Sequence, residues 1–144
     1  MGVLYDDRRH KMIYFFDTNI CVYYLNAKSL PLIEKIESID LEKIAIPSVT
    51  AAELYYGAAK SVKRDYNLSR YKAFLSIFDS ITFDHSAARI YGDIRAALEA
   101  KGQTIGGNDL MIAASALANE AVLVINNTGE FSRVDGLVLE DWTQ

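Results

Sequence analysis

The sequence predicts a single α/β domain in which a central, mostly parallel sheet of four to five strands lies between two layers of helices. Three observations indicate this fold. The chain has 144 residues, the length of one ordinary domain. Its hydrophobic share of 51% and charged share of 24% are typical of a folded globule. Short apolar runs rich in β-forming residues alternate with helical segments, the order expected of strands joined by right-handed helical crossovers.

Two strands and three helices are predicted in the first half of the chain. The apolar pattern predicts strands over 12–16 and 43–46, and helices over 20–26, 32–38 and 49–60. The first strand is apolar throughout, as expected of a strand buried on both faces, and it stops at Asp17. Pro31 suits the first turn of the second helix. Pro47 closes the second strand, and Ser48 or Thr50 is expected to cap the third helix.

The second half continues the alternation. The spacing predicts helices over 61–78, 84–102 and 110–118 and strands over 81–83 and 121–125, with 137–139 as a candidate edge strand. Asp84 or Ser86 is expected to start the long helix and Gly102 to end it. Asn108 or Asp109 is expected to begin the last helix, after two glycines.

Composition narrows the class of protein. Cys21 is the single cysteine, so an intrachain disulfide is excluded, and its apolar neighbours predict a small buried side chain. A reducing, cytoplasmic setting is expected. Residues 1–11 form a polar N-terminal extension without the apolar core of a secretory signal, and the sequence has no apolar window of membrane-spanning length. The net charge of −4 argues against broad attraction to polyanions, although an enzyme that holds phosphate through a metal ion needs only local positive charge.

Three carboxylates stand where such a fold places its ligands. Sites in parallel sheets lie at the carboxyl ends of the strands, which directs attention to Asp17 and to the loop after Ile125. Each acid also has a simple structural interpretation when it is taken alone. Asp17 can be a helix cap, and Glu53 can be an exposed residue of an apolar helix. Asp109 can be an acid that stabilises a helix start. Converging together, they would repel one another and favour Mg²⁺ or Mn²⁺ over zinc, since imidazole and thiolate ligands are lacking nearby.

Four sequence blocks in order resemble those of a known family. They are DTN at 17–19, IPSVTAAELYYG at 46–57, IGGNDLMIAA at 105–114, and NNTGEF at 126–131 followed by EDW at 140–142. These blocks resemble VapC toxins, the PIN-domain ribonucleases of bacterial and archaeal toxin–antitoxin pairs. The resemblance runs from Met12 to Trp142, which implies a PIN-like, Rossmann-like three-layer sandwich over residues 12–144.

The resemblance also implies an activity and a site. It implies a Mg²⁺-dependent endoribonuclease, with Mn²⁺ able to substitute, that acts as a toxin. Carried over residue by residue, it assigns catalysis to Asp17, Glu53, Asp109 and Glu130. Asp17 and Asp109 are expected to bind metal directly, and Glu53 to bind metal or orient the attacking water. An RNA substrate, a homodimer, and a VapB-type antitoxin that inserts a segment into the active-site groove, often with an arginine, are implied as partners.

Two departures from the family pattern leave alternatives open. Ile125 stands where the family often has threonine, so that a hydroxyl contact is lost or supplied by Thr128. Asn126 stands where some relatives carry an acid, so either Glu130 or Asn126 completes the site, with one or two metal ions. A PIN-like scaffold that has lost catalysis and binds RNA or protein is therefore a second hypothesis.

Phosphotransfer enzymes form a third class. Haloacid-type phosphatases need a second aspartate two residues after the first, and that position is Asn19 here. Receiver domains need an acceptor aspartate after the third strand and a lysine after a later one, and the sequence offers neither in a suitable place. Acyl-phosphate trapping distinguishes this class from a nuclease.

Basic and aromatic side chains in the middle of the chain have two readings. They are either a solvated helix face or a surface for phosphates and stacked bases, and they comprise Lys60, Lys63, Arg64, Arg70 and Lys72 with Tyr66 and Tyr71. Arg89 and Arg95 are equally ambiguous, while His85, Asp93 and Glu99 fit ordinary helix positions. The aromatic surplus is expected mostly in the core, with the remainder free for a partner; it comprises Tyr23, Tyr24, Tyr55 and Tyr56.

Overall fold

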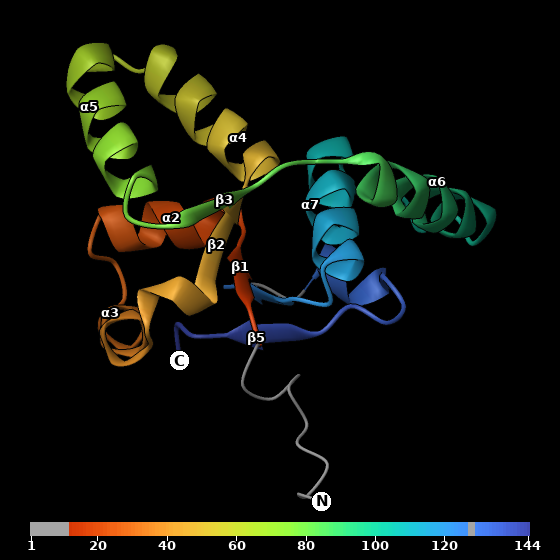
Figure 1. The fold of residues 1–144 in the computed structure, drawn as a ribbon. Coiled ribbons are helices and arrows are strands. Elements are labelled where there is room, and N and C mark those ends of the chain that lie inside the picture. The colour runs from red at the N-terminus through yellow and green to blue at the C-terminus, as the bar shows by residue number, and fades with distance from the viewer. Residues whose placement is uncertain (1–11, 127–128) are drawn as a thin grey trace, which may run out of the picture.

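The computed structural model describes residues 12–126 and 129–144, so the predicted extension of residues 1–11 lies outside the described part. Within these ranges the chain forms one five-stranded sheet in the order β3-β2-β1-β4-β5 (Figure 1), and every pair of neighbouring strands is parallel. The strands are β1 (Tyr14–Phe16), β2 (Ile44–Pro47), β3 (Asp79–Ile81), β4 (Val122–Ile125) and β5 (Leu139–Asp141). The predicted α/β class and parallel sheet are confirmed.

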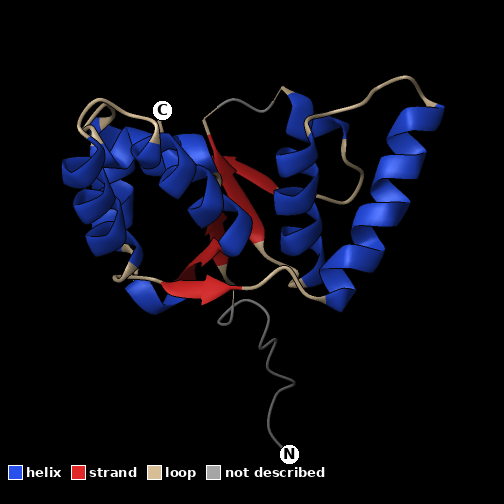
Figure 2. Ribbon diagram, turned by 90° about the horizontal axis from the view of Figure 1, so that it is seen from above, coloured by secondary structure: helices blue, strands red, loops and turns tan. Residues whose placement is uncertain are grey.

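Helices cover both faces of the sheet (Figure 2). They are α2 (Thr18–Leu25), α3 (Leu30–Ser38), α4 (Ser48–Ala59), α5 (Arg64–Leu75), α6 (His85–Ala100) and α7 (Gly107–Ala118), with short 3-10 helices η1 (Leu41–Lys43) and η2 (Glu130–Arg133). Side chains from α2 to α5 share one core cluster with the sheet, and side chains from α6 and α7 share the other. None of the helices in the described ranges is both long enough and apolar enough to cross a lipid bilayer.

Strand β1 lies at the centre of the sheet, which explains its continuous apolar run. Phe15 packs in the core cluster on the side of α7, and Phe16 packs in the cluster on the side of α2. Successive side chains of a strand point to opposite faces, so a strand with helices on both sides needs apolar residues at every position. Leu123 and Val124 of β4 divide between the same two clusters.

β3 begins earlier in the chain than the sequence pattern predicts, and β5 begins later. β3 covers Asp79–Ile81 instead of 81–83, and β5 covers Leu139–Asp141 instead of 137–139. β3 pairs Ala45 with Asp79 and Pro47 with Ile81 at the edge of the sheet. Asp79 and Ser80 are exposed there, so the sequence has no apolar run that would mark this strand. The strand is formed by its pairing with β2. The edge position predicted for the last strand is confirmed.

The predicted cap of the long helix is confirmed at Asp84. Its Oδ1 accepts a hydrogen bond from the backbone N–H of Ala87 at 3.0 Å. Gly102 follows the end of α6 with a φ of 65°, a left-handed conformation that glycine adopts without steric cost. Cys21 is fully buried on α2, as its apolar neighbours predict.

The prediction that Ser48 or Thr50 caps α4 is wrong. Pro47 occupies the cap position, and within the described residues no side chain caps this helix start. Both hydroxyls instead make tertiary contacts. Ser48 Oγ accepts a hydrogen bond from the backbone N–H of Phe83 at 3.3 Å, and the buried Thr50 Oγ1 donates to the Phe16 carbonyl at 3.0 Å. Thr50 therefore fastens α4 to the end of β1.

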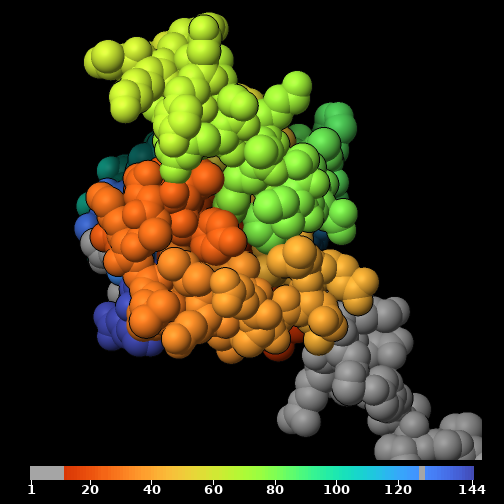
Figure 3. Space-filling model, turned by 90° about the vertical axis from the view of Figure 1, so that its left-hand side faces the viewer, coloured from red at the N-terminus to blue at the C-terminus, as the bar shows by residue number. Residues whose placement is uncertain are grey.

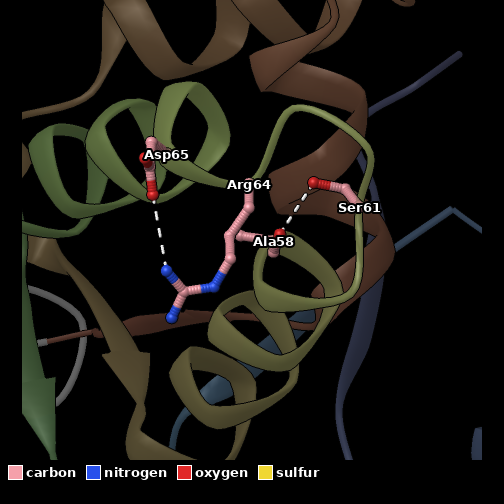
Figure 4. A network of polar contacts seen from close by, with 4 residues as sticks. All are labelled: Ala58, Ser61, Arg64 and Asp65. Carbon is pink, nitrogen blue, oxygen red and sulfur yellow. Dashed lines mark hydrogen bonds and ion pairs between the residues drawn. The ribbon is translucent and has the colours of Figure 1, made fainter.

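Helices α4 and α5 form a hairpin that projects from the carboxyl end of the sheet (Figure 1). Figure 3 shows α5 standing beside α2 and α3 on one face of the molecule. α5 begins at Arg64, later than the predicted residue 61, because residues 61–63 form the turn. The turn is closed by Ser61 Oγ, which donates to the Ala58 carbonyl at 2.7 Å, and Arg64 pairs with Asp65 at 3.4 Å on the surface (Figure 4).

The Thr50 contact predicts a specific loss of stability. We expect Thr50→Val to lower the free energy of unfolding by about 1–2 kcal/mol, because the Phe16 carbonyl loses a buried donor while the side-chain volume is nearly kept. Urea denaturation measures this change. Ser115→Ala is the control, since Ser115 Oγ is buried without a hydrogen-bond partner in the described chain, and its removal should be neutral or slightly stabilising. Equal losses in the two variants would contradict the prediction.

Candidate active site

Asp17 lies at the carboxyl edge of the sheet, between the end of β1 and the start of α2. Its Oδ1 accepts a hydrogen bond from the backbone N–H of Ile20 at 2.9 Å, so Asp17 does cap α2. Its own backbone N–H donates to the Val124 carbonyl of β4 at 3.2 Å. The side chain is only 6% exposed. Capping uses one carboxylate oxygen, so the cap and a role in a site are compatible.

Glu53 is held by one side chain on either side. Thr18 Oγ1, at the start of α2, donates to Glu53 Oε1 at 2.5 Å. Asn108 Nδ2, in the first turn of α7, donates to Glu53 Oε2 at 3.2 Å. Glu53 is half-buried, so it is not simply an exposed position in an apolar helix. It joins the β1–α2 connection, α4 and α7 at one point.

Asp109 and Glu130 come together from α7 and η2. Asp109 is half-buried in the first turn of α7, and its side chain hydrogen-bonds that of Glu130. Asn108, predicted as a helix cap alongside Asp109, does not cap α7, because the cap position is Gly106 and the Asn108 side chain reaches Glu53.

The four predicted acids influence one another electrostatically. Burial raises the pKa of Asp17 to about 7, and the negative charges of Asp109 and Glu53 add to the rise against the opposing Ile20 hydrogen bond. Burial also raises the pKa of Asp109 to about 6, with further contributions from Glu53 and Glu130. Negative charge thus accumulates at this edge of the sheet at a cost that a bound cation would relieve.

The donor set fits a hard divalent cation. The described ranges hold no group of three or more Asp, Glu, His or Cys side chains arranged to enclose a metal ion. Mg²⁺ does not require such a cage, since it keeps several waters and is usually held by one or two carboxylates together with substrate phosphate. Asp17 and Asp109 suit that arrangement. Glu53, whose two oxygens already accept hydrogen bonds, suits a position beside the ion.

Thr18 and Asn108 are the site residues that the sequence reasoning missed. Both belong to blocks that carry the family resemblance, and each lies next to a predicted acid. This adjacency is the feature of the sequence that could have indicated a role in the site. Their partner lies 35 and 55 residues away in the chain, so the contacts become visible only after folding.

The residues at and after the end of β4 that could complete the site differ in their burial. Ile125 is fully buried in the core cluster on the side of α7, so this position serves packing. Asn126 is half-buried directly after the strand. Thr128, considered as a replacement hydroxyl, lies outside the described residues. Glu130, by contrast, reaches Asp109.

Charged residues of α6 behave as surface positions. Arg95 pairs with Glu99 at 3.0 Å, one turn apart, and also donates to the Tyr91 hydroxyl at 2.8 Å. His85 and Asp93 are exposed on the same helix, as is Arg89. These observations agree with the ordinary helix positions predicted for His85, Asp93 and Glu99, and the pairing of Arg95 with Glu99 favours a solvated helix face for Arg95.

The predicted basic surface is divided by the structure. Arg70 points inward, donating to the Leu25 carbonyl at 2.6 Å and to Asn67 Oδ1 at 3.3 Å, so it fastens α5 to the end of α2. Tyr71 packs against the core cluster on the same side. Arg70 and Tyr71 therefore have structural roles.

Exposed lysines and tyrosines remain near the α4–α5 turn. Lys60 Nζ lies 4.7 Å from the centroid of the Tyr56 ring, and Lys63 Nζ lies 5.9 Å from that of Tyr66. Tyr56 is 64% exposed, so it belongs to the remainder of the aromatic set that is free for a partner and not to the core. These side chains keep positive charge and aromatic surface accessible on a chain of net charge −4.

A pocket of about 450 Å³ opens between α4 and α7. It includes Glu53 and therefore borders the acidic site. Its walls are formed by Ser48, Val49, Ala52, Glu53 and Tyr56 of α4 and by Asn108 and Met111 of α7.

Comparisons with known proteins identify the relatives of this chain. The PIN domain family model matches residues 14–137, a range that includes all four predicted acids. Ribonuclease VapC2 of Rickettsia felis is 45% identical over 132 residues, covering 91% of this chain and 98% of that protein. The tRNA(fMet)-specific endonuclease VapC of Shigella flexneri is 40% identical over 130 residues, covering 90% and 98%.

The likeness extends to solved structures. The crystal structure of VapBC2 from Rickettsia felis bound to a DNA fragment from their promoter matches with a TM-score of 0.84 and 45% identity. The match covers 91% of this chain and 99% of that chain.

The raised pKa values predict that the metal-free protein loses stability as pH rises. Asp17 and Asp109 bind protons more tightly in the folded than in the unfolded state, so their contribution is fully present below about pH 4 and is lost as pH rises through 6 and 7. For Asp17 the loss is at most about 4 kcal/mol. We expect the Tm in EDTA to fall between pH 5 and 8, and to fall less in Asp17→Asn.

Asp65→Asn is the matched control, because Asp65 is an exposed acid at the α4–α5 turn. It should keep the wild-type slope of Tm against pH. A wild-type Tm that rises over this interval, or an Asp17→Asn variant with an unchanged slope, would contradict the electrostatic picture.

Proposed function

Because the chain belongs to the VapC family of PIN-domain ribonucleases, we propose that its acidic edge hydrolyses RNA phosphodiester bonds with Mg²⁺, for which Mn²⁺ can substitute. Family membership makes the chain an endoribonuclease of the toxin class; the metal, the site residues and the partners are proposed here. The observation that supports the site best is that the buried Asp17 lies close enough to Asp109 and Glu53, acids from distant segments, for both of their charges to raise its pKa.

The residues divide into distinct roles in this proposal. Asp17 and Asp109 would hold the divalent ion, which when bound supplies Lewis-acid polarisation of the phosphate and stabilises the charge on the leaving oxygen. Glu53 orients a water for in-line attack on phosphorus and accepts its proton. Thr18 and Asn108 fix the Glu53 carboxylate by occupying one oxygen each. Glu130 adds negative charge beside Asp109 and raises the pKa of that carboxyl, which favours a cation at this point.

Partners follow from the relatives. The matching Rickettsia felis structure is a VapBC2 assembly, and we assign this chain a VapB-type antitoxin as its inhibitor. A homodimer and a cytoplasmic setting are part of the same proposal. The domain is taken as residues 12–144, slightly wider than the family match.

The alternative of a PIN-like scaffold without catalysis rested on Ile125 and Asn126. Ile125 is fully buried and packs in the core, where it supplies no hydroxyl to the site. The second support is weaker, because Glu130, an acid from the same block as Asn126, lies close enough to Asp109 to raise its pKa.

Removing either proposed metal ligand should abolish activity without unfolding the chain. We expect Asp17→Asn and Asp109→Asn to reduce Mg²⁺-dependent RNA cleavage by about 100-fold or more, as for other groups that stabilise transition-state charge. Mn²⁺ titration should show weakened binding in both variants, while circular dichroism stays unchanged. Asp65→Asn, the exposed control, should cleave as wild type does. Undiminished turnover in a purified Asp109→Asn variant would refute the assignment.

The contacts around Glu53 make a separate prediction. Thr18→Val should lower kcat by about 10- to 100-fold, the usual effect of losing a hydrogen bond that orients a site carboxylate, with KM and Mn²⁺ affinity little changed. Thr18→Ser, which keeps the hydroxyl, should restore most of kcat. A loss confined to stability, or a failure of serine to rescue, would show that Thr18 acts only structurally.

A further inference from the structure

The pocket between α4 and α7 continues the acidic site in one direction. Its α4 wall is one face of that helix, running from Ser48 and Val49 past Glu53 to Tyr56. The hydrogen bond between Glu53 and Asn108 spans the two helices and forms part of the lining. A molecule whose phosphate lies against the acids would therefore place its neighbouring group in this pocket.

The lining is mixed in a way that suits a flat, partly polar ring. Val49 and Met111 present apolar surface, while Ser48 and Asn108 present hydroxyl and amide groups. A volume of about 450 Å³ falls in the usual range of small-molecule sites, which is about 300–1,000 Å³. Hydrogen-bonding groups beside an apolar wall are what the edge and face of a nucleobase require.

Tyr56 and Lys60 give the pocket an aromatic and a cationic component. Tyr56 lines the pocket and is 64% exposed, so its ring is not needed by the core. Lys60 Nζ lies 4.7 Å from the ring centroid, which brings a positive charge to the same spot. Proteins that bind single-stranded nucleic acids combine aromatic platforms for bases with nearby cations for phosphates.

A protein segment is the competing occupant, and another surface suits it better. A groove of about 490 Å³ between α2, α3 and α5, on the face shown in Figure 3, is lined mainly by apolar side chains such as Tyr24, Ile33 and Phe74. An apolar helix would bury more surface there than against Ser48, Glu53 and Asn108. The mixed pocket beside the acids is thus the better match for RNA.

From these contacts we infer that the α4–α7 pocket is a nucleobase subsite, in which the base next to the scissile phosphate packs against Tyr56 while Lys60 contacts a flanking phosphate. This inference rests on the proposed function and adds to it the residues that position the nucleotide at the cut. Tyr56 is then a base-stacking residue and Lys60 a phosphate contact.

Binding measured without cleavage tests the inference. Fluorescence anisotropy of a labelled single-stranded RNA oligonucleotide in EDTA should show that Tyr56→Ala weakens binding by about 5- to 150-fold, the range for losing one base-stacking aromatic. Tyr56→Phe should bind nearly as wild type does. Tyr55→Ala is the matched control, because Tyr55 is the adjacent tyrosine, is 40% exposed and does not line the pocket.

Lys60 has its own readout in the same assay. Lys60→Gln should reduce the slope of log Kd against log salt by about 0.7, the value for one phosphate contact to a single strand. Lys35→Gln on α3 serves as control, since Lys35 also lies over an aromatic ring, at 5.6 Å from the Trp142 centroid, but lines a different pocket.

The outcomes separate the subsite from the reaction. If Tyr56→Ala binds RNA as tightly as Tyr55→Ala, the subsite is refuted even when Asp109-dependent cleavage is present. If Tyr56→Ala weakens antitoxin binding and leaves RNA binding unchanged, the pocket belongs to the protein partner and the inference is also refuted. If RNA binding depends on Tyr56 but wild type does not cleave, the subsite stands and the proposed reaction fails. Absence of RNA binding by wild type in EDTA refutes the subsite, whereas the proposed reaction, in which a metal ion holds the phosphate, is judged by cleavage with Mg²⁺.

Discussion

Repulsion among carboxylates buried at one edge of the sheet is the constraint that the structure accommodates. Asp17 is almost fully buried, yet it lies within electrostatic reach of Asp109 and Glu53. An acid in that position is unfavourable for stability unless it is protonated or accompanied by a cation. The fold keeps it there because the backbone on both sides is fastened, to Val124 in front and through the cap of α2 behind.

Hydrogen bonds between different elements hold the acids in place. Thr50 ties α4 to the last residue of β1, while Thr18 and Asn108 hold Glu53 from opposite sides. Each contact crosses between elements, so the acids are positioned by the relative placement of β1, α4 and α7. The apolar clusters on both faces of β1 fix that placement. The geometry of the site therefore depends on the packing of the core.

Charge is distributed unevenly over a chain whose total is negative. Arg70 serves the fold by fastening α5 to α2, because its guanidinium donates to the Leu25 carbonyl and to Asn67. Lys60 and Tyr56 remain accessible beside the pocket that borders Glu53. Positive charge at that spot, next to an acidic edge that would take up a cation, is compatible with a phosphate-containing substrate in spite of the net charge of −4.

Local pattern in the sequence determined the order of elements, the parallel sheet and the acids at helix and strand ends, because apolar periodicity and capping act over a few residues. The same pattern misplaced β3, whose exposed Asp79 and Ser80 are in a strand only through pairing with β2. It also assigned Ser48 and Thr50 to a cap, whereas packing turned their hydroxyls toward Phe83 and Phe16. The partners of Glu53, 35 and 55 residues distant, and the burial that raises the pKa of Asp17 depend on contacts between remote segments, which only the tertiary structure decides.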